Sequence, residues 1–110
     1  MRVIKGMITG VALSACVAIL VSAPQNKINP EVGKAIFKEK CAECHNADNR
    51  ESKDGPGLEG VKNGKLPSGR PATHDVILDL VNKGQESMPA FKEVLTEQQR
   101  EDVVAYVLTL

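Results

Sequence analysis

Aromatic side chains are scarce in this sequence of 110 residues, which contains two phenylalanines, one tyrosine and no tryptophan. All three (Phe37, Phe91 and Tyr106) lie within the 87 residues from Pro24 to Leu110. A chain of that size rarely builds a sufficient apolar core from its own side chains. The shortage favours a fold centred on a bulky apolar group over one held together by aromatic packing.

An excess of positive charge is also missing, since 14 basic residues are balanced by 14 acidic ones. Arg2 and Lys5 belong to the N-terminal segment, so the remainder carries 12 basic and 14 acidic side chains. A nucleic-acid-binding domain would show a basic stripe. The charge pattern therefore argues against nucleic-acid binding.

Cysteine is too rare for a disulfide framework, because Cys16 lies in an apolar segment and only Cys41 and Cys44 remain. These two belong to Cys41-Ala42-Glu43-Cys44-His45, which has the form C-x-x-C-H. That form is typical of covalent attachment of a c-type haem. Each sulfur forms a thioether with one porphyrin vinyl group, and one helical turn places both cysteines on one face. The adjacent His45 can then donate a ring nitrogen to the iron.

Two other interpretations of the same residues are weaker. A thioredoxin-like redox pair requires a βαβ context, and no alternating strand pattern surrounds Cys41 and Cys44. A structural zinc site requires four Cys or His ligands. Beyond the apolar segment the chain offers only Cys41, Cys44, His45 and His74, and His45 directly adjoins Cys44.

The N-terminal segment, 1–23, is expected to be a signal peptide or an uncleaved membrane anchor. Gly6 to Ala23 contains no charge and is just long enough to span a bilayer. Val21-Ser22-Ala23 resembles a signal-peptidase site, but Pro24 directly after the cut usually hinders cleavage. A third interpretation takes Leu13-Ser14-Ala15-Cys16 as a lipobox with Cys16 as the acylated residue.

All three interpretations place the rest of the chain outside the inner membrane of a bacterium. The basic N-terminus stays in the cytoplasm, so the chain after the apolar segment lies on the periplasmic side, either anchored or free in the periplasm. Residues 24–29 form a short linker, and residues 30–110 form the folded domain.

Helix signals divide this domain into three predicted helices, and no strand is predicted with any strength. Asn29-Pro30-Glu31 is a helix start, and that helix runs towards Cys41. A second helix is expected from near Thr73 to near Gly84. Thr96 to Gln99 fits a capping box, which starts a last helix running to near Leu110. The polar, glycine-rich stretch 46–70 is expected to be irregular.

From residue 30 to 110 the chain resembles the small bacterial class I c-type cytochromes, which carry one haem ligated by histidine and methionine. The fold implied is all-α, with about three to four helices around one covalent haem and with crossing N- and C-terminal helices. The features that carry the resemblance are Cys41-Ala42-Glu43-Cys44-His45, Gly55-Pro56-Gly57-Leu58, Met88-Pro89, and Gly33 and Phe37 paired with Tyr106.

The resemblance also implies roles for particular residues. Pro56 would accept a hydrogen bond from His45 through its carbonyl oxygen, which fixes the ring and raises its basicity. Leu58 would belong to the haem-binding residues, and Gly33 would let the two terminal helices approach closely.

The sixth iron ligand can be sought among the few residues able to serve. Met1 and Met7 lie in the N-terminal segment, which leaves Met88 and His74. Met88 lies in a loop stiffened by Pro89, where its thioether can reach the iron, whereas His74 stands at a helix start. Met88 is favoured, and His74 or an open site remain alternatives. For the haem propionates, Lys65 and Arg70 are possible partners.

With His45 and Met88 both on the iron, no substrate can bind there, so the sequence predicts a one-electron carrier and not an enzyme. Its partners would be redox proteins, mainly membrane-associated oxidoreductases. One alternative is a haem-bearing subunit or docking domain of a larger oxidoreductase. Another is a gas-binding haem protein with an open site.

Overall fold

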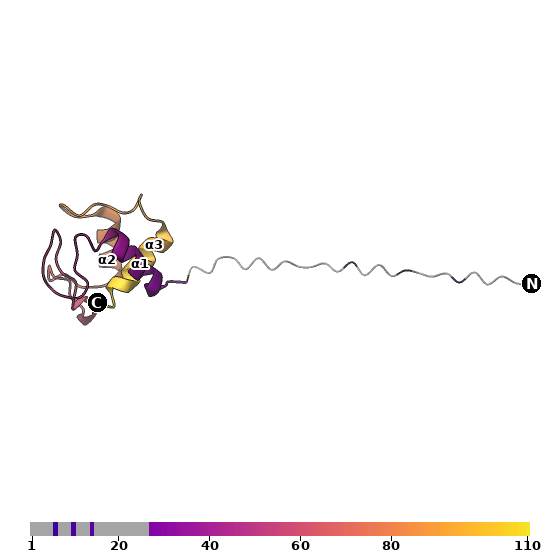
Figure 1. The fold of residues 1–110 in the computed structure, drawn as a ribbon, viewed down its shortest axis with the longest axis horizontal. Coiled ribbons are helices and arrows are strands. Elements are labelled where there is room, and N and C mark those ends of the chain that lie inside the picture. Colours follow the sequence, from indigo (N-terminus) through magenta and orange to yellow (C-terminus); the bar gives the residue numbers. More distant parts are fainter. Residues whose placement is uncertain (1–5, 7–9, 11–13, 15–26) are drawn as a thin grey trace, which may run out of the picture.

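The computed structural model describes residues 6, 10, 14 and 27–110. The predicted signal peptide or anchor, including Cys16, and the linker residues before Lys27 lie outside the residues described as a continuous chain. Within the described part the elements are α1 (Pro30–Lys40), the 3₁₀ helix η1 (Val61–Asn63), α2 (His74–Lys83) and α3 (Glu97–Val107) (Figure 1). None of the helices in this part is both long and apolar enough to cross a membrane.

The predicted start of α1 is confirmed by its hydrogen bonds. The Asn29 side chain accepts from the backbone N–H groups of Glu31 and Val32 at 3.0 and 3.4 Å, and Pro30 occupies the first helical turn. These contacts satisfy two N–H groups that would otherwise lack partners. The helix ends at Lys40, so Cys41 serves as its C-cap.

The other two helices also begin where the capping signals predict. Thr73 accepts from the Val76 N–H at 3.3 Å, and Gly84 follows the last residue of α2. At α3 the capping box is complete: the Gln99 N–H donates to the Thr96 hydroxyl at 3.2 Å, and the Thr96 N–H donates to the Gln99 side chain at 2.9 Å. The last helix ends at Val107, three residues before the predicted end.

The residues after α3 leave the helix to bind the irregular loop. The carbonyl oxygen of Leu110 accepts hydrogen bonds from the N–H groups of Gly60 and Lys62 at 3.1 and 3.0 Å. A continued helix would direct that carbonyl elsewhere and leave both loop donors without this acceptor.

Helices α1 and α3 pack directly against each other, as the resemblance implies. A Cβ atom on Gly33 would overlap the backbone carbonyl of Asp102 and lie 3.0 Å from the Cβ of Tyr106. Beside this contact the rings of Phe37 and Tyr106 meet edge to face, with centroids 5.3 Å apart. Only glycine permits so close an approach of the two backbones.

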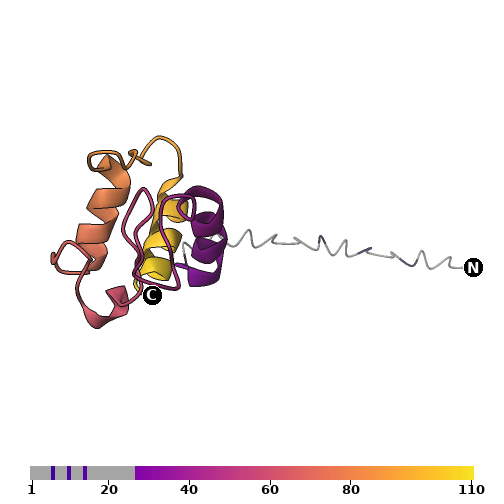
Figure 2. The same cartoon turned by 60° about the vertical axis from the view of Figure 1, so that its left-hand side comes forward.

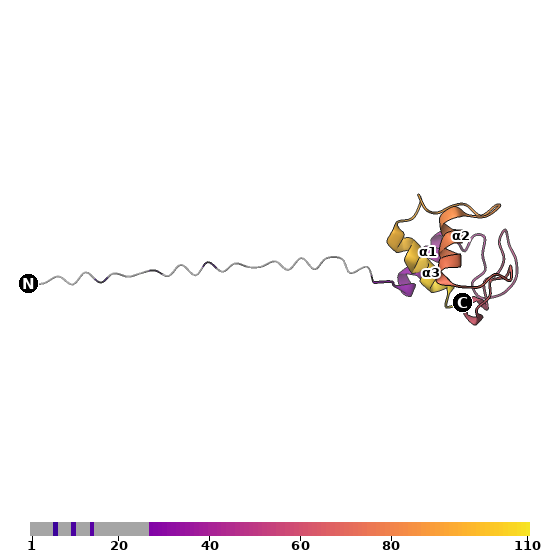
Figure 3. The ribbon, with the colours of Figure 1, turned by 180° about the vertical axis from the view of Figure 1, so that it is seen from behind.

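Helix α3 lies between α1 and α2 (Figure 2), and the view from behind brings α2 to the front (Figure 3). The long stretch between α1 and α2 contains η1 and no regular strand, only the isolated bridges His45–Ser52 and Lys65–Pro71. The buried apolar side chains come from all three helices and from the loops around them: Ile36, Phe37, Leu58, Val61, Leu66, Ile77, Val81, Phe91, Leu95, Val103, Val104 and Val107.

Candidate functional site

A cavity of about 410 Å³ lies among the three helices and the loops that connect them. Its wall is mainly apolar and includes Phe37, Leu66, Ile77, Leu80, Val81, Phe91, Val103 and Val107. All six residues predicted to bind the cofactor also line it: Cys41, Cys44, His45, Pro56, Leu58 and Met88. The fold thus gathers these six residues, which are up to 47 positions apart in the sequence, around one apolar space.

The end of α1 delivers the two cysteines to this cavity. The N–H groups of Cys41 and Ala42 both donate to the Phe37 carbonyl at 2.8 Å, and the His45 N–H donates to the Cys41 carbonyl at 2.9 Å. These bonds close a turn that carries both cysteine side chains into the wall of the cavity.

The environment of Cys41 differs from that of a redox-active thiol. Burial, together with the neighbouring Cys44, raises the pKa of the Cys41 thiol to about 11. Redox-active Cys-x-x-Cys pairs instead have a lowered thiol pKa, which provides the reactive thiolate. In the part of the chain that the structure describes, no three His, Cys, Asp or Glu side chains form a group able to hold a metal ion.

The His45 ring is oriented by its surroundings. Its Nδ1 lies 2.8 Å from the carbonyl oxygen of Pro56. Because a carbonyl only accepts, Nδ1 carries the proton, and Nε2 is left with a lone pair for a metal. Gly55 packs on the ring, since a Cβ there would lie 2.5 Å from Cε1 and 2.9 Å from Nδ1 of His45.

The position of Met88 is fixed by a tight turn after α2. Gln85 and Met88 exchange backbone hydrogen bonds, with N–H to O distances of 3.1 and 2.8 Å. At Gly84, where φ is +70°, a Cβ would overlap the Met88 carbonyl and lie 2.8 Å from the Ala90 nitrogen. Gly84 is therefore a positioning residue for Met88, whereas the sequence indicated only a helix stop at that glycine.

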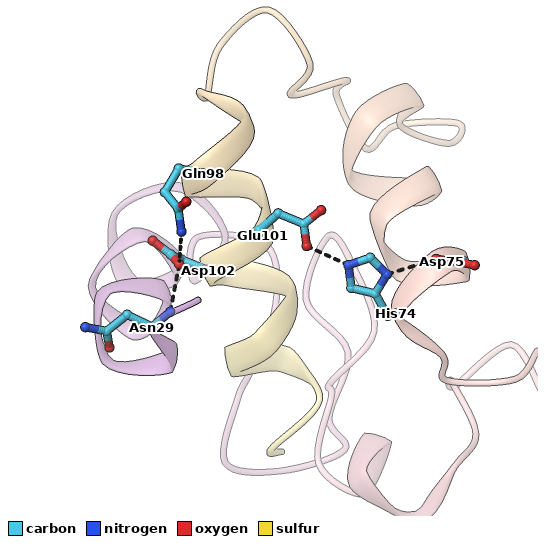
Figure 4. Close-up of polar contacts among 6 residues, drawn as sticks. All are labelled: Asn29, His74, Asp75, Gln98, Glu101 and Asp102. Atoms are coloured by element: carbon cyan, nitrogen blue, oxygen red, sulfur yellow. Dashed lines mark hydrogen bonds and ion pairs between the residues drawn. The ribbon is translucent and has the colours of Figure 1, made fainter. Parts of the chain in front are cut away.

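His74, the alternative ligand, does not line the cavity. Its Nε2 lies 2.6 Å from Glu101 on α3, and its Nδ1 lies 2.9 Å from Asp75 (Figure 4). The hydrogen bond to Glu101, followed by that to Asp75, raises the pKa of His74 above its ordinary value. Both ring nitrogens are thus engaged at the surface between α2 and α3.

Neither basic residue suggested for the propionates lines the cavity that contains Cys41, His45 and Met88. Lys65 lines a second cavity of about 500 Å³, which shares Leu66 and Pro67 with the first. Arg50 lines the same second cavity, and its guanidinium lies against Gly60, where a Cβ would be 2.9 Å from Nη2. Arg70 lines neither cavity, and no sequence pattern pointed to Arg50.

These residues fit a covalently attached haem. The apolar wall suits a porphyrin, the two thiols of the C-x-x-C-H segment line that wall, and the contact of His45 Nδ1 with Pro56 leaves Nε2 of the ring available to a metal. The close contacts at Gly55 and Gly84 hold the two candidate ligand segments in place. Fold and cavity together define a c-type cytochrome domain.

Comparison with known proteins leads to the same class. Residues 29–107 match the family described as cytochrome C oxidase, cbb3-type, subunit III. Cytochrome c6 of Rippkaea orientalis is 32% identical over 91 residues, covering 83% of this chain and 79% of that protein. The CcoP subunit of the cbb3-type oxidase of Rubrivivax gelatinosus is 36% identical over 81 residues, covering 72% of this chain but only 25% of that subunit.

A solved structure shows the shared fold. Cytochrome c6 from the diatom Phaeodactylum tricornutum superposes with a TM-score of 0.60 at 30% identity, covering 74% of this chain and 92% of that one. The chain therefore belongs to the monohaem class I c-type cytochromes, related to cytochrome c6 and to the cytochrome domain of cbb3 oxidase subunit III. It has the all-α cytochrome c fold and carries one covalent haem c. It is a cytochrome c6-like electron carrier and not an enzyme.

Proposed function

We propose that the chain carries single electrons between redox proteins on the periplasmic side of a bacterial inner membrane, with His45 and Met88 as the two axial ligands of its haem iron. When bound, the haem supplies reversible exchange between ferric and ferrous iron. The observation that supports the proposal best is that His45 and Met88 line the same cavity as Cys41 and Cys44.

The surroundings of the two ligands suit this role. Pro56 holds the His45 ring in the tautomer that leaves Nε2 free, so little reorganisation accompanies a change of iron charge. A methionine thioether favours the ferrous state relative to a second histidine, so we expect a comparatively high reduction potential. The basic side chains of Arg50 and Lys65, in the adjoining cavity, are the groups we assign to the haem propionates.

The proposed location and partners are supported by the sequence. The basic N-terminus followed by an apolar segment supports export of the domain from the cytoplasm. Donors and acceptors of the membrane-associated oxidoreductase class suit a small carrier whose contacts are transient.

Carbon monoxide tests the proposal on the native protein. With both axial positions filled, the reduced protein keeps its spectrum under carbon monoxide, and potentiometric titration shows a single one-electron transition. A rapid shift of the reduced spectrum under the gas would show an open site and would favour the gas-binding alternative.

A second candidate function is a haem-bearing subunit of a larger oxidoreductase. It is supported by the match of residues 29–107 to the subunit III family and by the similarity to one quarter of CcoP. Purification from the native host in mild detergent distinguishes the two functions. A stoichiometric complex that survives gel filtration supports the subunit, whereas a haem protein that elutes alone supports the carrier.

A further inference from the structure

The chain enters the folded domain along α3, where residues 27–29 are held by side chains of that helix. The Asn29 N–H donates to Asp102 Oδ1 at 2.8 Å, and Gln98 Nε2 donates to the Lys27 carbonyl at 3.3 Å. Gln98 Nε2 also donates to Asp102 Oδ1 at 2.9 Å, and Figure 4 shows this bond beside that of Asn29. The two contacts with the entering chain therefore belong to one network. Asp102 is only 4% exposed, so this network anchors the entering chain to the body of the domain.

This anchoring shortens the expected linker. Residues 24–29 would span about 20 Å if all six were free and extended. With 27–29 fixed to α3, only 24–26 remain, and three extended residues span about 10 Å. If Gly6 to Ala23 stays in the bilayer, the N-terminal end of α1 therefore lies close to the membrane surface.

Two large apolar side chains are exposed at this point of the surface. Ile28 is 48% and Val32 is 43% exposed, and they are two of the three large apolar side chains found exposed in the described part of the chain. Ile28 stands just before the N-cap, where an apolar residue usually packs on the fourth helical residue. That residue is Gly33, which has no side chain and is buried against α3, so Ile28 has no partner there.

We propose that this face, formed by Lys27, Ile28 and Val32, rests on the lipid bilayer that holds Gly6 to Ala23 as a retained membrane segment. Apolar side chains next to a lysine suit the boundary between acyl chains and headgroups. Only three residues, 24–26, separate the apolar segment from this face, and Pro24, which hinders signal-peptide cleavage, favours retention of the segment.

The proposal fixes the direction in which the cavity points. The α1 residues that line it (Phe37 and Lys40, with the C-cap Cys41) lie at the opposite end of the helix from Ile28. An 11-residue helix is about 16 Å long. The membrane contact thus holds the haem end of α1 away from the lipid, where partner proteins can reach it.

Spin labels on the full-length chain in phosphatidylcholine–phosphatidylglycerol vesicles test this orientation. Labels are attached through Ile28→Cys or Val32→Cys, and through Ser68→Cys at the cavity as the matched control, each in a Cys16→Ala background. Measured in the ferrous state, labels at 28 and 32 are expected to show a several-fold higher ratio of oxygen to nickel-chelate accessibility than the label at 68.

A second pair of variants tests whether the contacts of residues 27–29 with α3, and not tethering by the apolar segment alone, bring the face to the lipid. Asp102→Ala removes the acceptor shared by the Asn29 N–H and Gln98 Nε2, which weakens the hold on residues 27–29, so the lipid signature at 28 and 32 should fall. Because Asp102 is buried, Gln98→Ala provides a milder version of the same release. Equal accessibility ratios at 28, 32 and 68 in the parent would overturn the proposal. A mature chain that lacks the apolar segment, or that depends on Cys16 acylation for anchoring, would overturn it too. The electron-carrier proposal does not depend on which face meets the lipid, so failure here leaves that proposal intact.

Discussion

Two features of the position require glycine at residue 84: φ is positive, at +70°, and there is no space for a side chain. Gly84→Ala would force the Met88 carbonyl and Ala90 away from the end of α2. Beyond the backbone strain of about 1–3 kcal/mol, we expect the Met88 loop to shift and the Met88 sulfur to leave the iron in part of the population. Thermal unfolding and carbon monoxide binding by the reduced variant measure the two effects.

Gly69→Ala is the matched control for this prediction. Gly69 also has a positive φ, +87°, but a Cβ there meets nothing within 4 Å. The control should lose stability without binding carbon monoxide. If both variants bind the gas equally, Gly84 does not position Met88 in the way proposed.

His74 gives stability a dependence on pH. Its hydrogen bonds to Glu101 and Asp75 raise its folded-state pKa above the ordinary value of 6.5. The protonated ring therefore favours the folded state, so the stabilisation is complete below 6.5 and is lost as the pH rises through the raised pKa. Since the His74 side chain is 44% exposed, solvent screening keeps the effect small.

The difference in Tm between the parent and His74→Gln should shrink as the pH rises through the raised pKa of His74. Lys83→Gln, which removes the Asp79–Lys83 surface pair, is the control and should show no such trend. A Tm difference for His74→Gln that stays constant or grows with pH would contradict the assignment.

At the scale of helices, the sequence predicted most of what the structure shows. Asn29, Thr73 and Thr96 mark the three helix starts because each supplies a side-chain acceptor next to an apolar periodic run. Helix ends are harder to predict, since the end of α3 depends on hydrogen bonds from Gly60 and Lys62, far away in the chain.

The sequence predicts that the stretch 46–70 is irregular, but it does not predict the path of the backbone there. Its path depends on left-handed glycines such as Gly60 and on contacts between distant residues. Arg50 therefore reaches the second cavity without any local pattern that reveals it, and Asp102 is buried because it binds Asn29, 73 positions away. That Cys41 and His45 lie together at the cavity, by contrast, could be predicted, because the C-x-x-C-H form keeps them within four positions in the sequence.

The contact between α1 and α3 is sensitive to a single residue. Gly33→Leu places a side chain where even a Cβ overlaps the Asp102 carbonyl, so the helices must separate. We expect a loss of about 1–3 kcal/mol or more in the free energy of unfolding, measured by denaturant titration. Ala35→Leu, at an exposed position of the same helix, is the control and should cost little. If Gly33→Leu unfolds at the same denaturant concentration as the parent, the two backbones are not in direct contact.

For the molecule as a whole, the charge balance limits the influence of salt on partner encounter. Beyond the N-terminal segment the chain carries 12 basic and 14 acidic side chains. Long-range steering is weak for a surface so close to neutral. We expect the rate of electron transfer to a membrane oxidoreductase to change only moderately with ionic strength. A steep fall in this rate, measured by stopped-flow spectroscopy, would reveal a concentrated charged patch instead.

The sixth ligand of the iron decides whether the molecule works as a closed-site electron carrier, and near-infrared spectroscopy identifies it. The ferric parent should show the weak band of charge transfer from sulfur to iron, and Met88→Ala should lose it. The same variant should have a lower reduction potential and should bind carbon monoxide when reduced. His74→Ala, which removes the alternative ligand, should keep the band. A ferric Met88→Ala spectrum identical to that of the parent would contradict the proposal that His45 and Met88 ligate the iron.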